Sequence, residues 1–171
     1  SDRNSLVDND PFNKEVIGLI PTAIAKVSAL IAKAQTEPNY RALQWACIDK
    51  KDLPEPFRKE SFYDLLIEAL RAQSIYPTIG GRYICSENKP CYHKEPEFST
   101  YLPANDFPEL MPHTDDEGIK QLLSSLRPDT YTFTYFCAHF NQHYQNYNLN
   151  TYAQLLTALW QYEPDDLKGC P

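Results

Sequence analysis

Residues 62–70, F-Y-D-L-L-I-E-A-L, decide the fold class of this chain. Their apolar side chains recur at steps of three and four residues, which places them on one face of an α-helix. These apolar residues are Phe62, Leu65, Leu66, Ala69 and Leu70. A helix that is apolar on one face must bury that face against another element. The flanking sequence is therefore expected to supply further helices.

The sequence before this segment predicts two helical regions. Asp10 and Pro11 are typical of a helix start, because Asp accepts from the first free N–H groups and Pro lacks one. An apolar stripe at helical spacing follows, formed by Ile20, Ile24, Val27 and Ile31. Pro21 falls inside this pattern, so we expect either a kink there or a short helix followed by a longer one. A short helix over residues 40–47 comes next.

Three helices are predicted after residue 112. Residues 114–117, T-D-D-E, have the composition and spacing of a capping box and predict a helix that continues to residue 126. Pro128 and Asp129 open the next, although residues 131–135 also suit a strand. The last runs from about Asn150 to Tyr162. We expect an all-α fold, a single domain over residues 1–171 with a bundle of about six helices.

The segment 74–112 interrupts the helical pattern. It contains six prolines and the pair Gly80-Gly81, with no sustained period of either kind. An irregular segment of this length in a compact domain is usually functional or held by a cross-link. We expect it to lie over the helices as an ordered cover and to present aromatic rings to a partner. The predicted binding residues are Tyr83, Tyr92, Phe98, Tyr101 and Phe107.

Composition and charge restrict the partners. The formal net charge of −7 repels phosphate backbones, so we expect no nucleic acid partner, whereas a protein with a basic surface would be attracted. The most apolar stretch, residues 16–34, is interrupted by Pro21, Thr22, Lys26, Ser28 and Lys33, and we expect no membrane span.

Two of the five cysteines bracket a short polar loop, C-S-E-N-K-P-C at residues 85–91. Five intervening residues allow the two Cα atoms to approach within about 6 Å, the separation that a disulfide requires. We expect a Cys85–Cys91 disulfide, with free thiols as the main alternative and a metal site as a further one. A disulfide favours an exported or periplasmic location over a cytoplasmic one.

A second constellation is C-A-H-F-N-Q-H at residues 137–143. His139 and His143, four apart on a helix, project from the same side and can share one Zn²⁺. His93, or a Cys or acidic residue, could complete such a site, but the glutamate that serves as general base in H-E-x-x-H enzymes is absent. We expect ordinary histidines at the edge of an apolar stripe and no cofactor, and keep the metal site as the alternative.

Two segments carry a resemblance to a known family. Residues 53–57, L-P-E-P-F, followed by F-Y-D-L-L at 62–66, resemble the L-P-E-P-L segment of Rho GTPase-activating domains, and residues 119–159 are similar to a later helix pair in them. The resemblance implies a helical interaction domain. The family's G-[IFL]-[FY]-R finger does not precede Leu53, Arg82 follows the motif, and Gln154 stands where the family has asparagine, so the catalytic arginine is missing.

These observations favour a protein without catalysis. No G-x-S-x-G, P-loop or G-x-G-x-x-G motif is present in the sequence. We expect a protein-binding domain of the inhibitor or immunity type, using an acidic surface and the aromatic segment. The alternatives are a zinc enzyme or sensor that uses Cys and His residues, and a degenerate interaction domain of the Rho GTPase-activating type.

Overall fold

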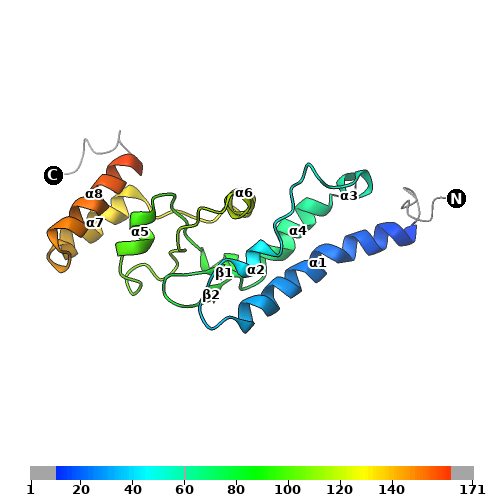
Figure 1. Ribbon diagram of the computed structural model, residues 1–171, viewed down its shortest axis with the longest axis horizontal. Coiled ribbons are helices and arrows are strands. Elements are labelled where there is room, and N and C mark those ends of the chain that lie inside the picture. The colour runs from blue at the N-terminus through cyan, green and yellow to red at the C-terminus, as the bar shows by residue number, and fades with distance from the viewer. Residues whose placement is uncertain (1–10, 60, 163–171) are drawn as a thin grey trace.

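The computed structural model describes residues 11–59 and 61–162, and the chain there is mainly α-helical, as predicted. Two short strands, β1 (Tyr76–Pro77) and β2 (Tyr83–Ile84), pair antiparallel, with Tyr76 opposite Ile84. The described residues form eight α-helices: α1 (Pro11–Ala34), α2 (Arg41–Gln44), α3 (Glu55–Lys59), α4 (Phe62–Arg71), α5 (Pro96–Tyr101), α6 (Glu117–Leu126), α7 (Phe133–His143) and α8 (Leu149–Tyr162). The arrangement is elongated, with α1, α3 and α4 towards one end and α7 and α8 at the other (Figure 1).

The first hydrophobic cluster lies where α1, α2, α4 and α6 meet. Helix α4 is central to it, because Phe62, Leu66 and Leu70 are buried on the face predicted from the sequence. Leu65, in contrast, is partly exposed. Arg71 at the end of α4 donates from Nε (3.0 Å) and Nη2 (2.9 Å) to the backbone oxygen of Leu126, the last residue of α6. This fork ties α4 to α6 and satisfies a helix-terminal carbonyl.

Helix α1 is one helix of 24 residues that contains Pro21, so the alternative of two successive helices is wrong. Pro21 is buried together with Ile17 and Ala25 on the side of α1 that packs against α4 and α2. By length and composition α1 could also cross a membrane, although core helices of soluble proteins and signal sequences share these properties. Only 28% of its apolar window is buried, and the expectation of no membrane span stays a prediction.

The second hydrophobic cluster is formed by α5, α7, α8 and the irregular segment. Phe98 and Phe107, both from residues 74–112, have no exposed surface and contact the ring of Phe136 from α7. The Phe98 and Phe136 rings stack with centroids 4.6 Å apart. The segment is ordered, as expected, but its phenylalanines are the interior of the cluster. It therefore completes a core rather than covering one.

The two clusters are joined by a backbone junction of three chain segments. Residues 90–92 run between residues 109–111 and Asp129. On one side the Cys91 N–H donates to Glu109 O (2.9 Å) and the Met111 N–H donates to Cys91 O (2.8 Å). On the other side the Asp129 N–H donates to Pro90 O (2.8 Å) and the Tyr92 N–H to Asp129 O (2.9 Å). Four hydrogen bonds thus hold three distant parts of the sequence together.

Helix starts differ from those predicted, because different side chains act as caps. Asp116 caps α6 by accepting from the Ile119 N–H (3.1 Å), which moves the start beyond Thr114. Thr132 caps α7 by accepting from the Tyr135 N–H (3.2 Å), so residues 133–135 are helical and the strand alternative is wrong. The α8 helix includes Leu149, and the Asn148 side chain accepts from the Thr151 N–H (2.9 Å).

His93 is a buried member of the second cluster. Its ring lies edge-on to Phe98 and Phe136, with centroids 5.2 Å away in each case, and its Nε2 accepts from the Tyr131 N–H (3.0 Å). Burial lowers the pKa of His93 to about 4. The imidazole is therefore neutral in the folded protein at neutral pH.

We predict that His93 makes the protein acid-sensitive. Its pKa is lower in the folded state than in the unfolded chain, so the unfolded state binds the proton first as the pH falls. The contribution of His93 to the free energy of unfolding is complete above about pH 6.5 and decreases towards pH 4, by about 3 kcal/mol. Urea titrations of the wild type and His93→Gln, which keeps an acceptor for Tyr131, should show this difference. Parallel pH profiles for the two proteins would contradict it.

Candidate functional site

The five aromatic residues predicted to bind a partner do not form one exposed surface. Phe98 and Phe107 are fully buried, and Tyr83, Tyr92 and Tyr101 are partly buried. The Tyr83 hydroxyl donates to Asn39 O (2.9 Å), which fixes β2 to the loop after α1. The rings are drawn inward because aromatic side chains are the main apolar material of an otherwise irregular segment. In this structure they stabilise the fold and leave little surface for a partner.

Cys85 and Cys91 are separate thiols, so the expected disulfide is not formed here. The Cys85 Sγ lies 3.2 Å from Asn88 Oδ1 in a short 3₁₀ turn, Ser86–Asn88. The Cys91 Sγ points to Lys89 O at 3.5 Å, and its backbone is held in the three-segment junction. The number of residues between the two cysteines allows a disulfide. The position of Cys91 is instead set by backbone pairing of its segment with residues 109–111 and 129. The favoured exported location, which rested on this bridge, stays a prediction.

We predict different reactivities for these thiols in the native protein. Burial, with the charges of Asp129 and Glu109, raises the pKa of Cys91 to about 12, so its thiolate is scarce at neutral pH. Cys85 lies in a partly exposed turn. Alkylation with iodoacetamide followed by peptide mass spectrometry should modify Cys85 first and Cys91 only after unfolding. A peptide carrying a Cys85–Cys91 bridge, without added oxidant, would contradict this.

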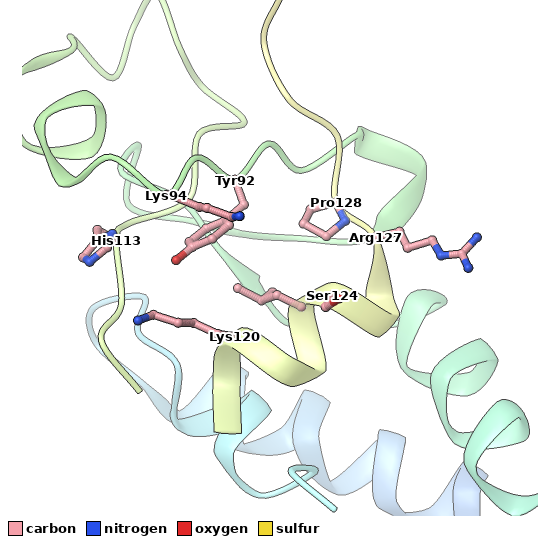
Figure 2. A pocket seen from close by; sticks show the side chains of 8 residues that line it. Tyr92, Lys94, His113, Lys120, Ser124, Arg127 and Pro128 are labelled. Carbon is pink, nitrogen blue, oxygen red and sulfur yellow. The ribbon is translucent and has the colours of Figure 1, made fainter. Parts of the chain in front are cut away.

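A pocket of about 370 Å³ opens between α6 and the chain around Tyr92. Figure 2 shows Tyr92 and Pro128 on one side of it and α6, with Lys120 and Ser124, on the other. Lys120 Nζ is 2.8 Å from Glu117 Oε1. The Arg127 side chain points away from Tyr92 (Figure 2). Lys94 and His113 also line the pocket, so cationic side chains surround a surface that is mainly apolar.

The two histidines of α7 meet an acidic residue from the irregular segment. His139 and His143 lie one helical turn apart, with ring centroids separated by 4.8 Å. His139 Nδ1 is 3.9 Å from Asp106 Oδ2, and the three potential ligand atoms all lie within 4.8 Å of one another. His93 does not join them, because it is buried against Phe98. Sequence spacing found the histidine pair, but Asp106 carried no signal that linked it to α7.

The surroundings of this cluster control its protonation. Burial lowers the pKa of His139, the charge of Asp106 opposes that effect, and the neighbouring His143 lowers the pKa further. The Tyr147 Oη is 2.8 Å from His139 Nε2. Burial and the Asp106 charge raise the pKa of Tyr147 to about 12, so this hydroxyl keeps its proton at neutral pH. The cluster is thus a neutral imidazole between a carboxylate and a phenol.

The outer face of α1 carries several exposed apolar side chains. Phe12, Leu19 and Leu30 are 69%, 63% and 64% exposed. Their spacing of seven and eleven residues, together with Val16, Ala23 and Val27 between them, places all six within about 80° of one helix face. This outer stripe, defined as these six residues, lies opposite the side that packs on α4. Residue periodicity alone did not show that α1 has two apolar sides.

No known protein family, curated protein or solved structure matches this chain. The resemblance to Rho GTPase-activating domains therefore rests on the two segments already described. In the structure, residues 53–57 lead into α3, residues 62–66 begin α4, and residues 119–159 contain most of α6 and α8 with all of α7. These segments are helical, as the resemblance implies, and relationship to that family stays a prediction.

Proposed function

We propose that this chain is a non-enzymatic protein-binding domain that associates with a second copy of itself through the outer stripe of α1. The observation that carries the proposal is the exposure of Phe12, Leu19 and Leu30 along one line of a long helix. Soluble monomers rarely expose a continuous apolar stripe of this length. A helix with apolar residues at i, i+4, i+7 and i+11 is typical of helix-to-helix recognition.

The stripe is self-complementary when two copies of α1 run antiparallel. Its residues are arranged nearly symmetrically about Pro21, with Phe12 and Leu30 nine positions away on either side and Leu19 and Ala23 two positions away. An antiparallel pair centred on Pro21 therefore places Phe12 against Leu30 and Leu19 against Ala23. The stripe spans 18 residue steps, or about 27 Å of helix. Interdigitation of these side chains removes the exposed apolar surface from water.

Charges beside the stripe favour the same register. Glu15 and Lys26 are both exposed and lie on the same flank of α1, because eleven residues correspond to about three helical turns. Glu15 is six positions before Pro21 and Lys26 is five positions after it. In an antiparallel pair related by a twofold axis, like flanks face each other, so Glu15 of each copy meets Lys26 of the other. Such exposed pairs add little affinity but select register and partner.

We predict that light scattering coupled to size-exclusion chromatography gives the mass of a dimer for the wild type and of a monomer for Leu19→Asp. A buried carboxylate at the centre of the stripe cannot be accommodated in an apolar interface. Leu149→Asp is the matched control, because Leu149 is 85% exposed on α8, at the other end of the molecule, and this variant should remain dimeric. A wild-type monomer at tens of micromolar, or equal disruption by Leu149→Asp, would refute the proposal.

A charge-reversal cycle tests the register. Glu15→Lys and Lys26→Glu should each weaken the dimer by about threefold, and the double variant should recover wild-type affinity, since exposed pairs contribute about 0.2–1 kcal/mol each. Flotation with phosphatidylcholine and phosphatidylserine vesicles tests whether the outer stripe binds a lipid surface instead of a second copy of the chain. A monomer that floats with vesicles would assign the stripe to a lipid surface and overturn self-association.

A further inference from the structure

We infer that Asp106, His139 and His143 form a three-ligand binding site for Zn²⁺ or a similar divalent first-row metal ion. This inference is independent of α1 and of self-association. Two imidazoles and one carboxylate are a donor set that such ions prefer, whereas Ca²⁺ and Mg²⁺ prefer oxygen ligands alone. The three potential ligand atoms lie within 4.8 Å of one another.

The separations are close to those that coordination requires. Zinc lies about 2.0–2.2 Å from imidazole nitrogen or carboxylate oxygen, so two ligand atoms at the tetrahedral angle on one ion are about 3.4 Å apart. His139 Nδ1 and Asp106 Oδ2 are already 3.9 Å apart. His139 is 7% exposed and fixed, while Asp106 is 43% exposed at its side chain. The Asp106 carboxylate, with the partly exposed His143, can supply the small remaining movement.

A hydrogen bond behind His139 selects the nitrogen that faces the ion. When His139 Nε2–H donates to Tyr147 Oη at 2.8 Å, the ring's lone pair lies on Nδ1, which is the atom near Asp106. Metal-bound histidines commonly donate their second N–H to such a partner, which fixes the tautomer and ring orientation. Asp106 is positioned as well, since the Tyr135 hydroxyl donates to its backbone oxygen (3.2 Å).

The site would connect two elements that are far apart in sequence. Asp106 belongs to the turn after α5, and both histidines belong to α7, with the Phe107 ring edge-on to His139 at 4.8 Å. A bound ion would therefore cross-link the irregular segment to α7 on the surface of the second cluster. With three protein ligands, one coordination position stays open to water or to an exogenous ligand. The absence of a glutamate beside His139 gives no general base of the H-E-x-x-H kind, so we assign binding and not hydrolysis.

The test uses Co²⁺ as the probe, because its visible absorption reports coordination number and geometry. Wild-type protein stripped with EDTA should bind one Co²⁺ per chain, Zn²⁺ should displace it, and the thermal unfolding midpoint should rise with bound metal. Asp106→Ala and His143→Ala should each weaken binding at least tenfold. Both residues are partly exposed, so these variants are expected to fold.

Two further variants separate a built site from surface binding. His113→Ala is the matched control, because His113 also lies against a carboxylate, with Nε2 3.1 Å from Asp115 Oδ1. Among residues 11–59 and 61–162 this pair has no third ligand, so the variant should bind Co²⁺ like the wild type. Tyr147→Phe should weaken binding about 10- to 100-fold with an altered Co²⁺ spectrum, as expected for loss of an orienting partner. The inference is overturned if the wild type binds no stoichiometric Co²⁺, or if Asp106→Ala and His143→Ala bind as tightly as His113→Ala.

Discussion

The backbone pairing of residues 90–92 with residues 109–111 and Asp129 is the constraint on which the rest of the structure depends. Each side of this short segment contributes two hydrogen bonds, so its polar groups are satisfied between two hydrophobic clusters. The pairing joins the chain between β2 and α5 to the chain between α5 and α6 and to the chain between α6 and α7. Without it, an irregular segment with little regular structure would have no fixed path.

Several local features follow from that junction. Cys91 is held in place by its backbone, so its thiol faces Lys89 O and does not bridge to Cys85. His93 comes two residues later and is carried into the interior of the second cluster, where burial lowers its pKa. Asp106 is brought to α7 because the chain must turn back from α5 before it reaches residue 109. Thus one set of backbone hydrogen bonds positions a thiol, a buried imidazole and the carboxylate that we propose as a metal ligand.

The two proposals place binding at separate parts of the molecule. The outer stripe of α1 belongs to the first cluster, and the Asp106, His139 and His143 site belongs to the second. Neither proposal depends on the net charge of −7, from which we expected a partner with a basic surface. That expectation concerns long-range attraction and stays a prediction, because the described contacts do not test it. The expected function as an inhibitor or immunity-type protein stays a prediction. So do its two alternatives, a zinc enzyme or sensor and a degenerate interaction domain of the Rho GTPase-activating type.

The sequence by itself determined the helical class and the positions of the main helices, because period and capping are local properties. Residues 62–70 fixed α4, and the pair His139 and His143 followed from spacing on one helix. Tertiary structure alone decided which aromatic rings are buried, why Cys85 and Cys91 stay apart, and which residue joins the histidines. Phe98, Phe107 and Asp106 lie where they do because of contacts between segments distant in sequence, and periodicity carries no information about such contacts. The sequence identified one apolar stripe on α1, at Ile20, Ile24, Val27 and Ile31. Only the packed structure shows that the side with Ile17 and Pro21 is buried while Leu19 and Leu30 are exposed.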